Sequence, residues 1–166
     1  CCPGNVTRFM ASVPSYAYAT QQNDIYVNLY IQGKAEMQTA DNKVTLEQTT
    51  EYPWNGKVTI KVTPEKEGKF AIRLRIPGWT KAAPVASDLY AYTDAAKKYT
   101  LKVNGSATRG AEGDGYETIV RTWKAGDVIE LEMPMDVRRI KANDKVEVDR
   151  GMVALERGPI MFCLEG

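Results

Sequence analysis

The sequence predicts an all-β protein, an antiparallel β-sandwich of jelly-roll type that is preceded by one short helix. Apolar and polar residues alternate in many short runs, which is the period of a strand with one buried face. Turn-forming residues separate these runs. No stretch after Pro14 has the amphipathic helical pattern that a parallel sheet needs between its strands. A chain of 166 residues, 43% of them hydrophobic, is long enough to bury a core of its own.

The clearest alternation lies in residues 25–32, 57–63 and 69–76. The segment Pro64-Glu65-Lys66-Glu67-Gly68 predicts a hairpin turn between the last two runs, because proline and glycine favour turn conformations. Further strands are expected at residues 44–46, 99–103 and 129–133, with weaker candidates at 117–123, 136–140 and 152–156. A last strand is expected at residues 160–164.

Residues 5–13 carry a helical pattern instead. Asn5 suits an N-cap, four apolar residues fall at i, i+3, i+4 and i+7 from Val6, and Pro14 ends the pattern. A helix this short is marginal in water, so it needs a neighbour to pack against. The chain also begins with cysteine rather than methionine. We therefore expect residues 1–14 to be the end of an upstream helical domain and residues 15–166 to form the sandwich domain.

The charge and composition of the chain exclude several classes of partner and site. Lysine and arginine number 22 against 21 for aspartate and glutamate, so a net charge of +1 gives no field that would attract nucleic acid or an anionic membrane. No apolar run approaches the ~20 residues that span a bilayer. Histidine is absent, which excludes serine–histidine and cysteine–histidine catalytic pairs and every histidine-ligated metal site.

Three cysteines are candidate reactive or metal-binding residues. Cys1 and Cys2 precede the expected helix, whose N-terminal end stabilises a thiolate and favours both nucleophilic attack and metal binding. Two thiolates make half of a tetrahedral zinc site, and Cys163 or carboxylates would have to complete it. The alternative is that Cys1 and Cys2 are plain buried or terminal thiols. Cys163 lies in an apolar run and is expected to be a small core residue.

Three tryptophans are candidate sugar-binding residues, because each lies beside turn residues. They are Trp54, Trp79 and Trp123. An aromatic side chain at a loop could stack on the face of a sugar. It could equally close one end of the sandwich, which is the commoner place for a tryptophan.

Four motifs, spread along the chain in a fixed order, resemble those of one enzyme family. They are Cys-Cys-Pro-Gly-Asn-Val-Thr-Arg at 1–8, Arg-Ile-Pro-Gly-Trp at 75–79, Trp-Lys-Ala-Gly-Asp at 123–127 and Arg-Gly-Met-Val-Ala-Leu-Glu-Arg-Gly-Pro at 150–159. Each is weak alone, but the four together resemble the β-L-arabinofuranosidase-like glycoside hydrolases. The resemblance implies a parent protein with a catalytic (α/α)6 barrel followed by β-sandwich modules, this chain starting at the end of the barrel.

The resemblance also implies roles for two cysteines. Members of the family hold a zinc ion with a glutamate and three cysteines, and the first cysteine of an adjacent pair attacks the anomeric carbon in a retaining mechanism. By this match Cys1 is the nucleophile and a zinc ligand, and Cys2 is a second ligand, in the complete parent. The other ligands and the glutamate that serves as general acid/base are expected upstream. We therefore expect the segment alone to hold no zinc and to be inactive.

Three functional hypotheses follow. We favour a non-catalytic β-sandwich portion of a glycoside hydrolase that acts on plant-type arabinofuranosides or related glycosides, supporting the catalytic barrel of the same protein. The alternative is an autonomous carbohydrate-binding module that uses exposed aromatic side chains. A plain protein-interaction domain is the third. The sequence assigns no substrate-binding residue and no compartment; the resemblance implies that the parent is bacterial and acts in the periplasm or after secretion.

Overall fold

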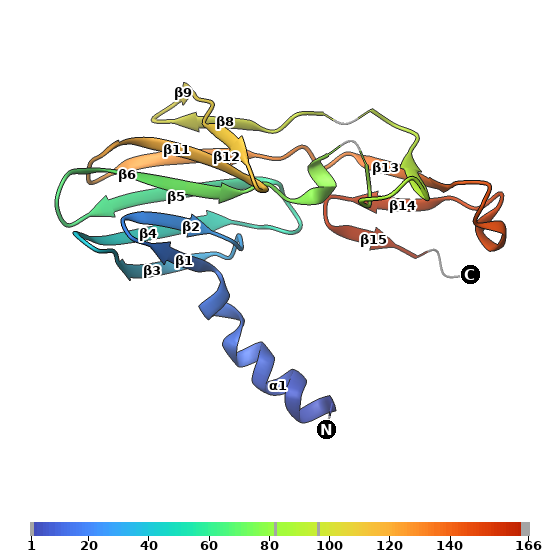
Figure 1. The fold of residues 1–166 in the computed structure, drawn as a ribbon, viewed down its shortest axis with the longest axis horizontal. Coiled ribbons are helices and arrows are strands. Elements are labelled where there is room, and N and C mark those ends of the chain that lie inside the picture. Colours follow the sequence, from blue (N-terminus) through green and yellow to red (C-terminus); the bar gives the residue numbers. More distant parts are fainter. Residues whose placement is uncertain (1, 82, 96, 164–166) are drawn as a thin grey trace.

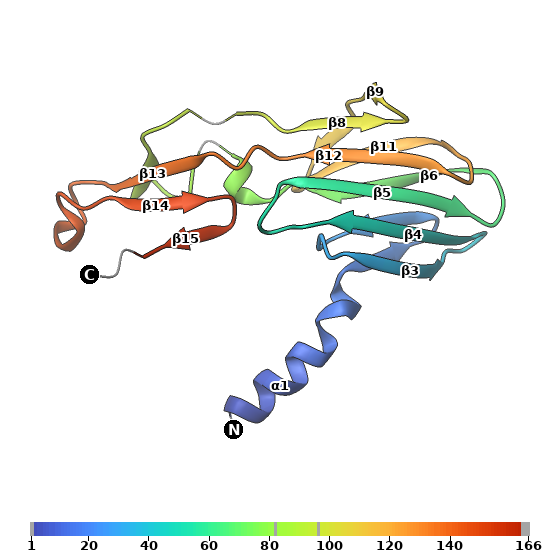
Figure 2. The ribbon, with the colours of Figure 1, turned by 180° about the vertical axis from the view of Figure 1, so that it is seen from behind.

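The computed structural model of the chain describes residues 2–81, 83–95 and 97–163. Two sheets pack face to face as a sandwich, and a third sheet lies beyond one end of it (Figure 1). The N-terminal helix projects from the sandwich at an angle, as the view from behind also shows (Figure 2). The predicted all-β sandwich with one short N-terminal helix is therefore confirmed.

Helix α1 (Cys2–Ser12) begins earlier than the sequence predicts. Asn5 lies inside the helix and is not its cap, because Pro3 fits the first turn, where its missing N–H leaves no bond unmade. None of the described side chains of α1 is buried. The 3-10 turns are η1 (Val13–Tyr16), η2 (Gly78–Thr80) and η3 (Glu147–Asp149). No helix in the described part of the chain is long and apolar enough to cross a membrane.

The sandwich consists of a first and a second sheet. The strands of the first sheet, in spatial order, are β1 (Tyr18–Gln21), β2 (Asp24–Val27), β6 (Gly68–Arg75), β11 (Tyr116–Trp123) and β10 (Ala111–Gly113). Those of the second sheet are β3 (Gly33–Gln38), β4 (Lys43–Thr50), β5 (Lys57–Pro64), β12 (Asp127–Glu132), β8 (Thr100–Val103) and β9 (Ser106–Ala107).

The hydrophobic core lies between these two sheets. Strand β5 alternates between exposed and buried residues along its whole length, as its sequence predicts. Its inward residue Ile60 belongs to the same buried cluster as Ile72 of β6 and Trp123 of β11, all of them 0% exposed. Burying one such side chain contributes about 1.5–3 kcal/mol, so the cluster is the main stabilising element of the sandwich.

One neighbouring pair departs from the antiparallel pattern. Strand β2 runs parallel to β6, with Ile25 opposite Ile72 and Val27 opposite Leu74. A parallel pair needs a long crossover, for which the sequence offers no helix. The chain makes this crossover through the second sheet, where it forms β3, β4 and β5 before it returns as β6. Strands of the second sheet thus provide the crossover that a helix provides in other parallel pairs.

The run at residues 25–32 is a strand only as far as Val27. Tyr30 then turns into the core, where it is 5% exposed and its hydroxyl donates a hydrogen bond to the Arg75 carbonyl at 2.5 Å. Ile31, predicted to face inward, is 40% exposed. The apolar alternation therefore continues beyond the point where the chain leaves the sheet.

The third sheet collects strands from distant parts of the chain. In spatial order they are β15 (Ile160–Phe162), β14 (Ala154–Arg157), β13 (Val137–Ala142) and β7 (Tyr90–Tyr92). All of its pairs are antiparallel. The first three strands are neighbours in the sequence, whereas β7 comes from the long connection between the η2 turn and β8.

One arginine ties the third sheet to the sandwich. The guanidinium carbon of Arg138, in β13, lies 3.1 Å from the ring centre of Tyr92. Its Nη1 donates hydrogen bonds to the carbonyl oxygens of Trp79 and Lys81, at 3.0 and 3.1 Å. The Tyr92 hydroxyl lies 3.0 Å from both carboxylate oxygens of buried Glu156. Burial and this carboxylate raise the pKa of Tyr92 to about 12.

Candidate functional sites

The predicted cysteine site lies at the N-terminal end of α1. Cys1 falls outside the described residues, and Cys2 is the first residue of the helix, with an exposed side chain. Cys163 is also exposed, so its predicted place in the core is wrong. The reason is that β15 ends at Phe162, and the chain leaves the sheet before it reaches Cys163.

A metal ion needs several donors brought together. Within residues 2–81, 83–95 and 97–163, no three cysteine, aspartate or glutamate side chains gather closely enough to hold one. The thiol of Cys2 is a donor that zinc accepts, so the residue type fits the metal that the resemblance implies. A single described thiol is not a site, and Cys1 with Cys2 stays a predicted part of one.

The three tryptophans lie in three different environments. Trp123 is 0% exposed and donates its indole N–H to the Phe70 carbonyl at 3.1 Å. Trp79 packs partly buried against the core, and its indole N–H reaches the Tyr52 hydroxyl at 3.2 Å. Trp54 is 69% exposed. Trp123 and Trp79 therefore pack in or against the core of the sandwich, and Trp54 is the tryptophan available to a ligand.

A cleft with a volume of about 560 Å³ opens at the edge of the sandwich. Glu117 of β11 lies at this cleft and is 3% exposed. Its carboxylate accepts hydrogen bonds from the Tyr99 hydroxyl at 2.7 Å and from the Gly110 N–H at 2.5 Å. Burial, then the Glu117 carboxylate, raises the pKa of Tyr99 above its ordinary value. Both carboxylate oxygens of Glu117 are already hydrogen-bonded. The pair of Glu117 and Tyr99 therefore has a structural role, which is to close the edge of the core.

Sequence reasoning missed this pair, although a signal was present. Glu117 falls on the same face of its strand as Ile119, so the alternation places a carboxylate among inward apolar side chains. A buried carboxylate without partners is too costly to keep, so such a position predicts hydrogen-bond donors nearby. Tyr99 lies just before β8 and Gly110 just before β10, and their proximity to Glu117 could not be read from the sequence.

A second cleft, the joint cleft, lies where the sandwich meets the third sheet and measures about 310 Å³. It is lined by residues 54–57 at the end of the β4–β5 loop and the start of β5, by Lys97, by residues 132–136 from the last residue of β12 onward, and by Arg157 at the end of β14. Arg157 donates an Nη1–H bond to the Trp54 carbonyl at 3.0 Å and so joins the two sides of the cleft. A Cβ at Gly56 would lie 1.8 Å from the Met133 carbonyl oxygen, so this approach requires glycine.

The half-buried aromatic residues Tyr26 and Tyr116 on the first sheet do not form a flat platform. The rings of Tyr26 and Tyr116 lie 5.4 Å apart at an interplanar angle of 90°. Arg73 stacks over Tyr26 at 5.2 Å and pairs with Asp24 at 2.8 Å. Because a sugar chain lies against coplanar rings, this face is not suited to bind one. The hypothesis of a carbohydrate-binding module depends on Trp54 instead.

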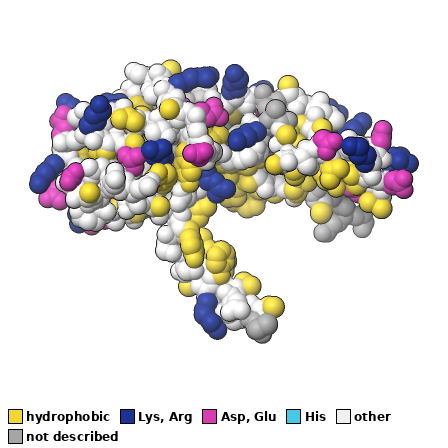
Figure 3. Space-filling model, viewed as in Figure 1, with side chains coloured by type: hydrophobic (Ala, Val, Ile, Leu, Met, Phe, Trp, Pro, Cys, Tyr) yellow, Lys and Arg dark blue, Asp and Glu magenta, His cyan; other side chains and the backbone are white. Residues whose placement is uncertain are grey.

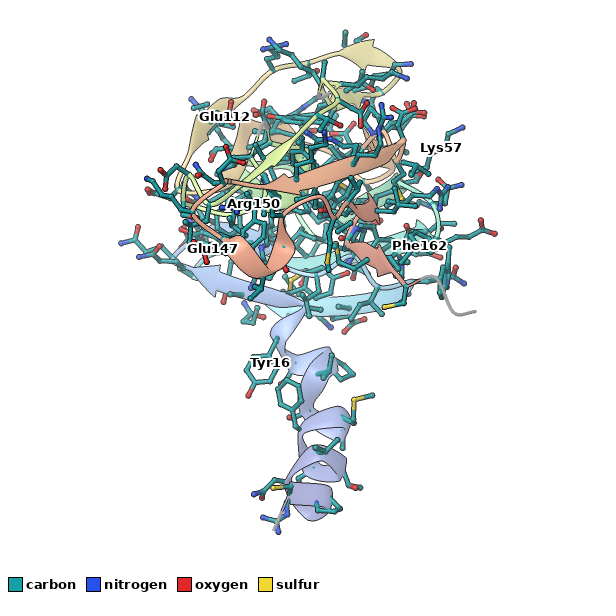
Figure 4. All side chains as sticks on the ribbon, turned by 90° about the vertical axis from the view of Figure 1, so that its right-hand side faces the viewer. Tyr16, Lys57, Glu112, Glu147, Arg150 and Phe162 are labelled. Carbon is teal, nitrogen blue, oxygen red and sulfur yellow. The ribbon has the colours of Figure 1, made fainter. Side chains whose placement is uncertain are left out.

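An exposed apolar face follows α1 and the outer strands of the third sheet. We use the term apolar face for seven residues whose side chains are 46–64% exposed: Val6, Phe9, Met10, Tyr16, Val153, Met161 and Phe162. Figure 3 shows hydrophobic side chains along the helix and along the lower side of the third sheet. Figure 4 shows Tyr16 where α1 joins the sandwich and Phe162 at the rim of the third sheet. The helix and the third sheet lie on either side of the open angle between the helix and the body (Figure 1).

Two family profiles match almost the whole chain. The one described as the β-L-arabinofuranosidase GH127 middle domain matches residues 24–135. The one described as the glycoside hydrolase family 127 C-terminal domain matches residues 137–166. The boundary between them falls just before β13, where the chain passes from the sandwich into the third sheet.

Longer proteins contain a segment similar to this chain. A non-reducing end β-L-arabinofuranosidase of Bifidobacterium longum subsp. longum is 34% identical over 172 residues, which cover 99% of this chain and 23% of that protein. A solved GH127 β-arabinofuranosidase is 47% identical, with a TM-score of 0.90, over 97% of this chain and 25% of its own. The GH127 β-L-arabinofuranosidase of Geobacillus stearothermophilus T6 is 36% identical, with a TM-score of 0.84, over 99% of this chain and 24% of its own. The chain, about a quarter as long as these relatives, therefore belongs to glycoside hydrolase family 127, of whose enzymes it forms the middle and C-terminal β part.

Proposed function

We propose that this chain is the non-catalytic β part of a β-L-arabinofuranosidase and that it supports the catalytic barrel of the same protein. The observation that carries the proposal is the apolar face, because the chain leaves it uncovered. The similar enzymes are about four times as long as this chain, so most of each lies beyond the matching segment. A protein surface is the partner that such a face fits.

The apolar face has the composition of a buried interface. Phe9 and Met10 of α1 are 57% and 64% exposed, and the ring of Phe9 contacts only the ring of Tyr16, 6.2 Å away, among the described aromatic residues. A helix of eleven residues is marginal in water by itself, so α1 needs packing against a neighbour. Apolar surface of this extent on a soluble protein marks an interaction site. The angle between α1 and the third sheet provides room for a rounded domain (Figure 2).

The catalytic step would then take place where α1 enters the barrel. In the complete protein Cys1 and Cys2 would both hold a zinc ion, which would supply the charge that favours the thiolate form. The thiol of Cys1 would attack the anomeric carbon of an arabinofuranoside, and water would later release the sugar from Cys1. A glutamate of the upstream part donates the proton to the leaving oxygen. Cys2 lies on the first turn of α1, so anchoring this helix would also orient the Cys2 thiol.

The test replaces one side chain of the apolar face in the complete protein. Phe9→Asp removes an apolar contact worth about 1.5–3 kcal/mol, which we expect to lower the thermal midpoint, speed proteolysis near α1 and reduce hydrolysis of an aryl β-L-arabinofuranoside. Val120→Asp is the matched control, because Val120 is 58% exposed on the outer side of the first sheet. Equal behaviour of the two variants would overturn the proposed docking.

The proposed roles of the cysteines have a separate test. Cys1→Ser should abolish hydrolysis by the complete protein while its fold, followed by circular dichroism, stays intact. Cys2→Ser should reduce the zinc content measured by elemental analysis. Full activity of Cys1→Ser, or full zinc content of Cys2→Ser, would contradict the assignment.

A further inference from the structure

We infer that the joint cleft is an accessory binding site for a neutral saccharide, with the indole of Trp54 as its stacking surface. The inference rests on the proposed function for the kind of sugar that reaches the protein, but the site itself is built from this chain. It differs from the catalytic site, which depends on residues upstream of the chain.

The first argument is the combination of one aromatic side chain with a polar cleft. Trp54 is 69% exposed at a cavity of about 310 Å³, which is large enough for a monosaccharide unit. A sugar ring offers a C–H face to an indole and hydroxyl groups to polar side chains.

The second argument is that hydrogen-bonding groups in the cleft remain available. The Glu132 carboxylate has no hydrogen bond or ion pair with any other described residue. Asn55 uses its side-chain oxygen to accept the Lys57 N–H at 2.9 Å, which leaves its amide N–H2 group for a ligand. A carboxylate acceptor beside an amide donor matches neighbouring hydroxyls of a sugar.

The third argument is that the cleft is preorganised. The Trp54 N–H donates to the Glu51 carbonyl at 2.8 Å, and the Trp54 carbonyl accepts the 3.0 Å bond from Arg157. Both peptide groups that flank the indole are therefore fixed before a ligand arrives, which reduces the entropy lost on binding.

The charges of the lining explain why the expected ligand is neutral. Positive and negative side chains are nearly balanced: Lys57, Lys97 and Arg157 against Glu132 and Asp136. Lys97 and Asp136 are moreover paired with each other at 3.0 Å. An anionic sugar would gain little from such a cleft and would meet the unpartnered Glu132 carboxylate.

The test titrates this chain with short arabino-oligosaccharides and follows the three indole N–H signals by NMR. We expect the Trp54 signal to shift in a saturable way while the signal of buried Trp123 stays in place and reports the fold. Trp54→Ala should weaken binding by at least about tenfold, and Glu132→Gln should weaken it less. Trp79→Phe is the control and should bind as the unmodified chain does.

Three results would overturn the inference: no saturable shift, shifts confined to Trp79, or equal binding by Trp54→Ala. If acidic oligogalacturonides bound more tightly than the neutral arabino-oligosaccharides, the claim that the ligand is neutral would be overturned. In the complete protein, an iodide quencher should reach Trp54 when sugar is absent; protection without sugar would assign the indole to the domain interface instead. Hydrolysis of an aryl β-L-arabinofuranoside tests the proposed function separately, since a failed accessory site leaves this reaction unchanged.

Discussion

Replacing Arg138 tests how the third sheet is held to the sandwich. Arg138→Ala removes two hydrogen bonds from a charged donor to the carbonyls of Trp79 and Lys81, each worth about 1.5–3 kcal/mol. It also removes the stacking on Tyr92, worth about 2 kcal/mol in a desolvated setting. In the opposite direction, Nε and Nη2 of Arg138 are buried without a hydrogen-bond partner among the described residues, a cost that the variant relieves.

The balance of these contributions is a loss of about 3 kcal/mol in the free energy of unfolding, since each unpartnered N–H group costs about 1–3 kcal/mol. For a chain of this size, this corresponds to a fall of about 6–12 °C in the thermal midpoint. We expect β13 and β14 to respond first. Their amide hydrogen exchange should accelerate in Arg138→Ala more than that of β5 and β6, which lie in the sandwich.

The neighbouring residue provides the matched control. Arg139 also carries a guanidinium and also belongs to β13, but its side chain is 61% exposed and pairs with Asp94 at 2.9 Å. Exposed ion pairs contribute about 0–1 kcal/mol, so Arg139→Ala should lower the midpoint much less than Arg138→Ala does. If the two variants lose the same stability, or if exchange in the third sheet stays slow in Arg138→Ala, the reasoning about Arg138 is refuted.

Three further predictions concern the core, the pH dependence of stability and the cleft at Glu117. Trp123→Ala should cost about 3–5 kcal/mol in chemical denaturation, because a large buried side chain leaves a cavity; a loss below about 1 kcal/mol would contradict its place in the core. The hydrogen bonds from Arg139 hold the pKa of Asp94 well below its usual range. The ionised Asp94 carboxylate therefore stabilises the folded chain above the ordinary aspartate pKa, near pH ~4, and this stabilisation is lost as the pH falls below that value. The stability difference between the unmodified chain and Asp94→Asn should therefore shrink on acidification, and a constant difference would refute this sign. Tyr99→Phe should lower the free energy of unfolding by about 1.5–3 kcal/mol. A double-mutant cycle with Glu117→Gln should show that the two losses are not additive, and additive losses would show that the two side chains do not interact.

Strands with one buried face could be predicted because their burial repeats with the period of the backbone. Strand β5 shows this most clearly, and the sequence places it within one residue of the observed bounds. Strands β1 and β10 escaped prediction because none of their residues is buried, so no alternation arises. They are held by backbone hydrogen bonds to a neighbour, and such pairing leaves no trace in residue type.

The tryptophans show how far local sequence reaches in predicting a site. Trp123 and Trp54 both lie beside turn residues, yet one is 0% and the other 69% exposed. The strand register separates them: Trp123 falls on the inward face of β11 with Ile119, whereas Trp54 lies in a loop. The joint cleft could not be predicted, because Arg157 reaches Trp54 from a strand that follows it by a long stretch of sequence.

The division of the chain into a middle and a C-terminal part does not coincide with the way its strands pair. Strand β7 lies within the residues matched by the middle-domain profile, yet it pairs with β13, which lies within the C-terminal one. Arg138 and Arg157 likewise reach from the C-terminal part to backbone carbonyls of the middle part. Each of these contacts joins residues far apart in sequence, so neither part completes its own structure. The third sheet is therefore positioned by its contacts with the middle part of the chain.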